Sequence, residues 1–97
     1  MIEATTTGAP CRDVTITNRR GLHARAAARF VQLAEKFDAE VTVSKDATAV
    51  GGTSIMGLMM LAAGIGSVIR IAATGAQAEA AVAALYDLVA DRFGEDE

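Results

Sequence analysis

The 97-residue sequence has few of the residues that build disulfides and metal centres. Cys11 is its one cysteine and His23 its one histidine, so neither an internal disulfide nor a zinc site of the usual kind can form. Tryptophan is absent and only 4% of the residues are aromatic. We therefore expect no metal and no cofactor. The lack of a disulfide favours a reducing, cytoplasmic setting.

Long apolar runs are also missing. No apolar stretch approaches the ~20 residues that a membrane-spanning helix needs. The opening segment 1–5 lacks the basic region and apolar run of a secretory signal. We therefore expect no membrane association. Apolar residues still make up 52% of the chain, and 21 residues are alanine. This composition predicts a core of Val, Ile, Leu and Met packed against small Ala faces.

Acidic residues are absent from positions 14–34, although the net charge of the whole chain is −3. This gap holds His23 and four of the nine basic residues, namely Arg19, Arg20, Arg25 and Arg29. The net charge argues against nucleic acid as a partner. A local basic patch on an acidic protein indicates a small anionic target or an acidic partner surface.

The chain divides into three parts by composition. A chain of this length fits one domain. Residues 1–11 are rich in Thr, Ala, Gly and Pro without periodicity, which indicates a flexible extension. Residues 12–93 carry the periodic patterns of a folded domain. Residues 94–97 form an acidic tail that we expect to be frayed.

Hydrophobic periodicity predicts an alternation of strands and helices. Polar and apolar residues alternate in the predicted strands, and apolar residues recur at helical intervals in the predicted helices. The predicted strands are 13–17, 40–44, 48–50 and 68–72, and the predicted helices are 24–37, 55–61 and 77–93. Alternating strands favour an antiparallel sheet with one covered face. The sequence thus predicts a two-layer α+β domain with three helices on that face.

His23 lies between a glycine turn and the first residues of the helix predicted over 24–37. The first-turn N–H groups of a helix lack intrahelical partners and favour an anion. Arg25 lies at the same point, and a guanidinium matches phosphate oxygens with a planar fork of donors. A neutral imidazole can accept a phosphoryl group. On residue types alone, His23 could instead be a helix cap or a surface residue, and Arg25 and Arg29 could be a solvated helix face.

Two motifs resemble those of a known family. The segment Gly21-Leu22-His23-Ala24-Arg25, preceded by Asn18-Arg19, resembles the active-site signature of the HPr family. Members of that family are the histidine-containing phosphocarriers of the bacterial phosphoenolpyruvate-dependent phosphotransferase system. The segment 54–59, Ser-Ile-Met-Gly-Leu-Met, resembles the regulatory serine segment that begins the family's second helix. The resemblance covers residues 12–92 and implies an open-faced β-sandwich, a four-stranded antiparallel sheet with three helices.

The resemblance also implies roles for particular residues. His23 would be phosphorylated on Nδ1 and Arg25 would hold the phosphoryl oxygens. Ser54 would be the site for an HPr kinase/phosphorylase. The chain departs from the family where many members have proline in place of Ala26, and where many have Lys or Asn in place of Thr53. Without its first-turn proline the helix entry is softer, and the second departure bears on regulation at Ser54.

The partners implied by the resemblance are proteins. Enzyme I would donate the phosphoryl group and a IIA-type protein would accept it, in sugar uptake or in metabolic regulation. The chain would act as a monomeric carrier and not as an enzyme. The residues expected to contact partners are Arg20, Leu22, Ala24, Arg29, Met56, Leu58 and Met59. Methionine repacks readily against different partners, although any one of the Met and Leu side chains could instead belong to the core.

Other functional classes have weaker support in the sequence. A small-ligand-binding regulatory module could use Gly51-Gly52 or Gly64-Ile65-Gly66 to approach a metabolite, but these glycine signals are not specific. An RNA-binding domain could use the arginine-rich stretch, but the net charge and the scarcity of aromatics oppose it. For a stand-alone enzyme, the sequence offers neither a paired-carboxylate site nor a cysteine nucleophile with a partner.

Overall fold

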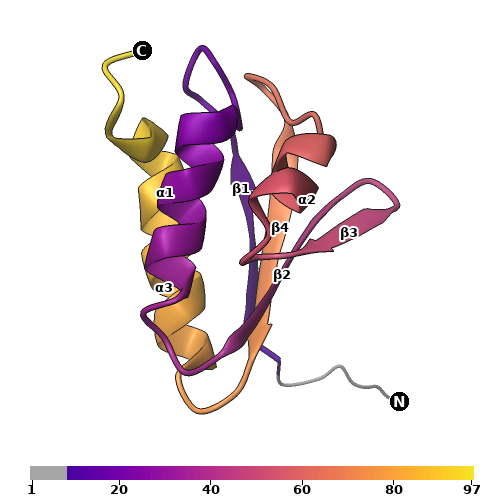
Figure 1. The fold of residues 1–97 in the computed structure, drawn as a ribbon, viewed down its shortest axis with the longest axis vertical. Coiled ribbons are helices and arrows are strands. Elements are labelled where there is room, and N and C mark those ends of the chain that lie inside the picture. The colour runs from indigo at the N-terminus through magenta and orange to yellow at the C-terminus, as the bar shows by residue number, and fades with distance from the viewer. Residues whose placement is uncertain (1–8) are drawn as a thin grey trace.

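The computed structural model describes residues 9–97 (Figure 1). Its elements follow in the order β1 (Cys11–Thr15), α1 (Ala24–Ala34), β2 (Glu40–Lys45), β3 (Thr48–Gly51), α2 (Ile55–Met60), β4 (Val68–Thr74) and α3 (Ala78–Ala90), with a short 3₁₀ turn, η1 (Arg92–Gly94), at the end. The predicted order of four strands and three helices is confirmed.

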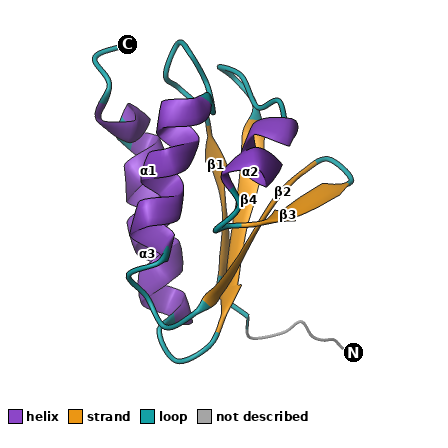
Figure 2. Ribbon diagram, in the orientation of Figure 1, coloured by secondary structure: helices purple, strands orange, loops and turns teal. Residues whose placement is uncertain are grey.

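The four strands form one antiparallel sheet in the order β1-β4-β2-β3. The register places Val14 of β1 opposite Ile69 of β4, and Ile71 of β4 opposite Val43 of β2. The helices lie together on one side of the sheet (Figure 2). The protein is therefore a two-layer, open-faced α+β sandwich, as the sequence predicts.

The core lies between the sheet and the helices. Alternate strand residues point toward the helices, and Val43, Ile69 and Ile71 are fully buried there. The two helices α1 and α3 pack with small residues, including Ala26 and Ala81. The aliphatic and alanine parts of the predicted core are thus correct. The prediction of methionine in the core is wrong for the three methionines of α2, Met56, Met59 and Met60, which are exposed.

Phenylalanine supplies the two largest fully buried side chains, Phe30 of α1 and Phe93 of η1. Both side chains therefore carry much of the packing energy in a chain that has few aromatic residues.

The ends of several elements differ from their predicted positions. Strand β1 begins at Cys11, two residues earlier than predicted, and Ala73 N–H donates to the Pro10 carbonyl over 3.1 Å. Cys11 of the predicted extension therefore belongs to the sheet and Pro10 is hydrogen-bonded to its edge, while residues 1–8 lie outside the described part of the chain. Helix α1 ends at Ala34 because the N–H groups of Lys36 and Phe37 bond to carbonyls three residues back, which tightens the chain into turns.

Helix α3 ends at Ala90, three residues before the predicted end. Arg92 and Phe93 both have positive φ angles, of 57° and 55°, which an α-helix does not accommodate. This turn still buries Phe93, so the predicted apolar stripe continues although the helix does not. The chain then runs back toward the loop that precedes α1 (Figure 1). Of the residues described, no helix is both long and apolar enough to cross a membrane.

Candidate functional site

His23 is the N-cap residue of α1. Its backbone is extended (φ −78°, ψ 179°), and its carbonyl accepts the first helical hydrogen bond from Ala27 N–H at 2.8 Å. Its side chain makes no capping hydrogen bond to the helix. The imidazole is therefore held at the mouth of α1 without being used as a cap.

A tight turn before His23 fixes where the helix begins. Gly21 has a φ of +65°, and a Cβ there would lie 2.6 Å from the Ala63 carbonyl oxygen. Leu22 N–H donates to that same oxygen over 2.9 Å, and the Leu22 side chain is only 6% exposed. Glycine is required at this turn, and the buried leucine anchors the chain so that the next residue lies at the surface.

The His23 ring contacts the C-terminal tail. Its Nε2 lies 2.5 Å from Oε2 of Glu95, and the two side chains are 14% and 18% exposed. The other carboxylate oxygen, Oε1, accepts a hydrogen bond from Nδ2 of Asn18 at 3.1 Å. Asn18 is fully buried and also donates to the Gly21 carbonyl at 2.8 Å. Within residues 9–97, Nδ1 of His23 has no hydrogen-bond partner.

The acidic tail is therefore bound, and the expectation that it is frayed is wrong. Besides the Glu95 contacts, the main-chain oxygen of Glu97 accepts from Arg19 N–H at 2.7 Å, and Arg92 donates to the main-chain oxygen of Asp96 at 3.0 Å. The physical reason is charge complementarity, because the tail carboxylates meet the segment of the chain that has no acidic residue.

The pKa of Glu95 is lowered from its ordinary value. Burial alone would raise the pKa, but the hydrogen bonds from His23 and Asn18, with the charges of His23 and Arg20, outweigh that effect. Glu95 is therefore an ionised carboxylate at neutral pH, and it accepts hydrogen bonds without donating any.

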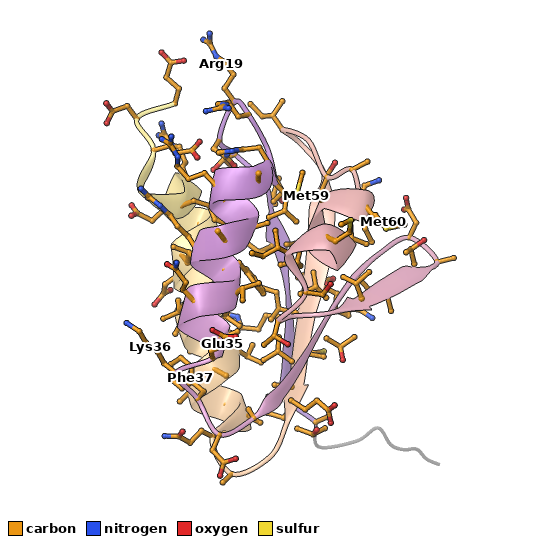
Figure 3. All side chains as sticks on the ribbon, in the orientation of Figure 1. Arg19, Glu35, Lys36, Phe37, Met59 and Met60 are labelled. Carbon is orange, nitrogen blue, oxygen red and sulfur yellow. The ribbon has the colours of Figure 1, made fainter. Side chains whose placement is uncertain are left out.

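A shallow hollow of about 400 Å³ lies beside this contact. It is lined by Arg19, Arg20, Arg25, Arg29 and the tail residues 94–97. The structure thus brings together the four arginines of the acid-free segment. Figure 3 labels Arg19 at this end of the molecule, and Lys36 and Phe37 at the opposite end of α1.

The first turn of α1 adds backbone donors to the site. The N–H groups of Ala24, Arg25 and Ala26 make no backbone hydrogen bond within the described residues. The Ala24 and Arg25 side chains are exposed. Amides without a partner, a helix dipole and several guanidinium groups together can bind an anion. The one nucleophilic group among them is the imidazole.

Ser54 is the N-cap residue of α2. Its Oγ accepts a hydrogen bond from Gly57 N–H at 3.0 Å, and the residue is exposed. A Cβ at Gly57 would lie 3.1 Å from Cβ of Val50, so the missing side chain lets α2 pack closely over β3. The serine hydroxyl is thus accessible at the start of a short helix.

The expected partner residues fall into two groups. Leu58 is 0% exposed and Leu22 belongs to the same core, so neither side chain can offer surface to a partner and the prediction for both is corrected. Both were expected on an apolar patch beside the site, with the core as the alternative, and the structure buries both of them in the core. Met56 and Met59 are 73% and 44% exposed on α2, and Figure 3 labels Met59 and its neighbour Met60 there. Arg20 and Arg29 are also exposed.

Two residues of the site were not predicted, Asn18 and Glu95. From the sequence, Asn18 is only a residue that precedes the active-site motif, without a role of its own, and Glu95 belongs to a tail expected to be frayed. A partial signal was present, since an acid-free, arginine-rich segment and an acid-rich tail occur in one small chain. Sequence separation of 72 residues between His23 and Glu95 hides their contact from any local pattern.

These features define a small α+β protein with one partly exposed imidazole in an anion-binding setting. Comparison with known proteins gives the family. The family described as "PTS HPr component phosphorylation site" matches residues 11–91. The chain therefore belongs to the HPr family of phosphocarrier proteins of the phosphotransferase system.

Individual relatives agree with this assignment. The chain is 50% identical over 86 residues to the phosphocarrier protein HPr of Cupriavidus necator, covering 89% of this chain and 97% of that protein. It is 49% identical to HPr of Neisseria meningitidis serogroup A, with the same coverage. The crystal structure of HPr-C-His from Thermoanaerobacter tengcongensis superimposes with a TM-score of 0.86 at 43% identity, over 91% of this chain and 99% of that one. A phosphocarrier is an intermediate in a relay and not a catalyst, so the chain is not an enzyme.

Proposed function

We propose that His23 is the residue that carries the phosphoryl group, on Nδ1. The observation that supports this most strongly is the asymmetry of the ring. Nε2 is engaged by Glu95 at 2.5 Å, whereas Nδ1 has no partner within residues 9–97 and lies on the residue that caps α1. The same ring is the only imidazole in the sequence. Enzyme I is the proposed donor and a IIA-type protein the proposed acceptor.

Transfer to His23 exchanges one P–N bond for another. The Nδ1 lone pair attacks phosphorus, and the bond from phosphorus to the donor's imidazole nitrogen breaks with its electron pair leaving on the donor. Phosphoryl transfer has a loose transition state, so alignment and charge stabilisation are what the protein supplies. Arg25 and the first-turn amides are the proposed groups that stabilise the phosphoryl oxygens.

A carrier must also release its load. Arg25 is exposed, and its interaction with an anion is screened by water and salt. Interactions of this kind stabilise the transferring group without making the phosphorylated state too stable to pass it on. The shallow, open shape of the site therefore suits a relay better than a deep pocket would.

Partner recognition is proposed to combine charge and apolar contact. Arg20 and Arg29 would attract acidic partner surfaces and raise the rate of encounter. Met56 and Met59 offer adaptable apolar area beside them, and Ala24 leaves space for close approach. We place this exchange in the cytoplasm, where the partners of the relay would meet it, and expect the chain to act as a monomer in sugar uptake, metabolic regulation or both.

Ser54 is proposed as a second modification site, for an HPr kinase/phosphorylase. A phosphoryl group there would add about −1.5 to −2 charges at pH 7. The start of α2 tolerates negative charge, so the effect would fall on docking of partners at the neighbouring methionines and not on the fold. Incubation with such a kinase, followed by mapping of the modified residue, tests this role. Absence of label at Ser54 with an active kinase would refute it.

Substitution of His23 tests the main proposal. His23→Ala should abolish acceptance of phosphoryl groups from phosphorylated Enzyme I, because no other imidazole is available. The side chain makes no capping hydrogen bond to α1, so the circular dichroism spectrum should remain that of the folded protein, although loss of the contact with Glu95 should lower the unfolding midpoint. Phosphorylation of His23→Ala to the same extent as the unsubstituted protein would contradict the assignment.

A further inference from the structure

The contact between Glu95 and His23 differs from an ordinary surface ion pair. Both side chains are more than four-fifths covered, and the distance between Nε2 and Oε2 is 2.5 Å. For comparison, Arg19 and Glu97 in the same tail are paired at 3.2 Å but are 75% and 66% exposed. An exposed pair of that kind contributes little. The covered carboxylate of Glu95 is therefore positioned to influence which nitrogen of the His23 ring carries a proton.

Asn18 holds the carboxylate from its other side. The amide nitrogen of Asn18 donates to Oε1 of Glu95 and to the Gly21 carbonyl. Both partners are acceptors, which determines the orientation of this fully buried amide. Glu95 therefore has each oxygen bound to a group of the loop that precedes α1.

The backbone of the tail is also shaped for this contact. Phe93 is fully buried, and Arg29 of α1 donates to its carbonyl oxygen. Gly94 follows with a φ of +77°, and a Cβ there would lie 2.8 Å from Nη1 of Arg29. The buried ring and the following turn thus direct residue 95 onto the mouth of α1.

We propose that Glu95 is a positioning residue for phosphoryl transfer, whose carboxylate holds His23 as the Nε2–H tautomer and so leaves the lone pair on Nδ1. Which nitrogen of a histidine carries the proton is set by the hydrogen bond that the other nitrogen makes. An ionised carboxylate can only accept, so its partner Nε2 must be the protonated nitrogen. This inference rests on the proposed role of His23.

The same carboxylate also fits the charge change of the reaction. When the Nδ1 lone pair forms the new P–N bond, Nε2 keeps its proton and the ring acquires a positive charge. Glu95 remains ionised and lies against that charge. When the phosphoryl group leaves for an acceptor, the electron pair of the P–N bond returns to Nδ1 and the neutral Nε2–H ring is restored. No proton has to enter or leave the ring in either direction.

Nuclear magnetic resonance of the ring tests the inference directly, because His23 gives the only imidazole signals. With ¹⁵N-labelled histidine, at a pH where the ring is neutral, the unsubstituted protein should show Nε2 protonated, Nδ1 as the unprotonated nitrogen, and an Nε2 proton in slow exchange with water. Glu95→Gln can both accept and donate, so it should give a mixture of tautomers and a rapidly exchanging proton. Asp87→Asn is the matched control. It removes one exposed acid on α3 that makes no side-chain hydrogen bond within residues 9–97, and it should leave the signals unchanged.

Kinetics supply the second readout. Glu95→Gln should slow phosphoryl acceptance from Enzyme I by about ten- to a hundredfold, by analogy with the loss of a carboxylate that orients a metal-bound histidine. Tautomer signals that are the same in Glu95→Gln and the unsubstituted protein would overturn the inference, even if both proteins are phosphorylated normally. Failure of the unsubstituted protein to accept phosphate would instead contradict the role of His23, and the spectra would still report on Glu95.

Discussion

At the scale of single residues, His23 combines a ring with a fixed environment on one side and an open nitrogen on the other. The fixed side comes from Glu95 and Asn18, whereas Nδ1 has no hydrogen-bond partner within residues 9–97. Arg25 lies two positions into the helix, where its guanidinium can reach an anion held by those amides. The chemistry of the site is thus divided between a nucleophile, groups that orient it and groups that stabilise charge.

Arg25 gives the prediction at this scale. Arg25→Ala should slow phosphoryl acceptance about tenfold, because one charge-assisted hydrogen bond is worth about 1.5–3 kcal/mol and the exposed site lies at the weak end of that range. The rate of Arg25→Lys should lie between those of Arg25→Ala and the unsubstituted protein, since an ammonium keeps the charge but not the planar fork of donors. Rapid-quench assays with phosphorylated Enzyme I measure these rates.

Arg70→Ala is the matched control for Arg25. It also removes an exposed guanidinium, but Arg70 pairs with Asp13 on the sheet, with Nε 2.8 Å from Oδ1. Its rate should equal that of the unsubstituted protein. A rate for Arg25→Ala that matches Arg70→Ala would remove Arg25 from the site.

At the scale of elements, the turn before α1 sets the position of the site. Gly21→Ala should destabilise the fold by about 1–3 kcal/mol, because its φ is +65° and the new Cβ would lie 2.8 Å or less from backbone atoms of Ala63 and Gly64. Gly64→Ala is the control, since its Cβ would meet nothing within 4 Å. Urea unfolding of both variants checks this. Equal stability of the two variants would show that the turn is not strained by a side chain.

The sequence predicts the four strands and the three α-helices, but not every boundary and not the turn η1. Alternation and helical periodicity are local, so they identify the strands and helices reliably. Helix α3 ends early because Arg92 and Phe93 adopt positive φ, a conformation that neither residue type favours, so the sequence gives no local signal of it. The burial of Leu22 and Leu58 and the docking of Glu95 depend on distant parts of the chain, which no local pattern contains.

At the scale of the whole molecule, the docked tail couples stability to pH. The pKa of Glu95 is lowered in the folded state from an ordinary value of 4.5. The carboxylate therefore stabilises the fold fully above about pH 4.5, and this contribution is lost as the pH falls through the lowered folded pKa. The difference in unfolding free energy between the unsubstituted protein and Glu95→Gln should be positive at pH 7 and shrink in acid.

Denaturant unfolding between pH 3 and 7 measures that difference. Asp87→Asn again serves as the control, and it should show no such convergence with the unsubstituted protein in acid. A difference for Glu95→Gln that stays constant across the pH range would mean that the carboxylate does not contribute through its ionised form.

The most direct test of the central claim is incubation with Enzyme I and phosphoenolpyruvate, followed by intact-mass measurement after exposure to alkali and to acid. The account predicts one added phosphate that survives alkali and is lost in acid, as a phosphohistidine would be, and His23 is the only histidine available. No added phosphate in the presence of active Enzyme I, or one that is stable in acid, would contradict it.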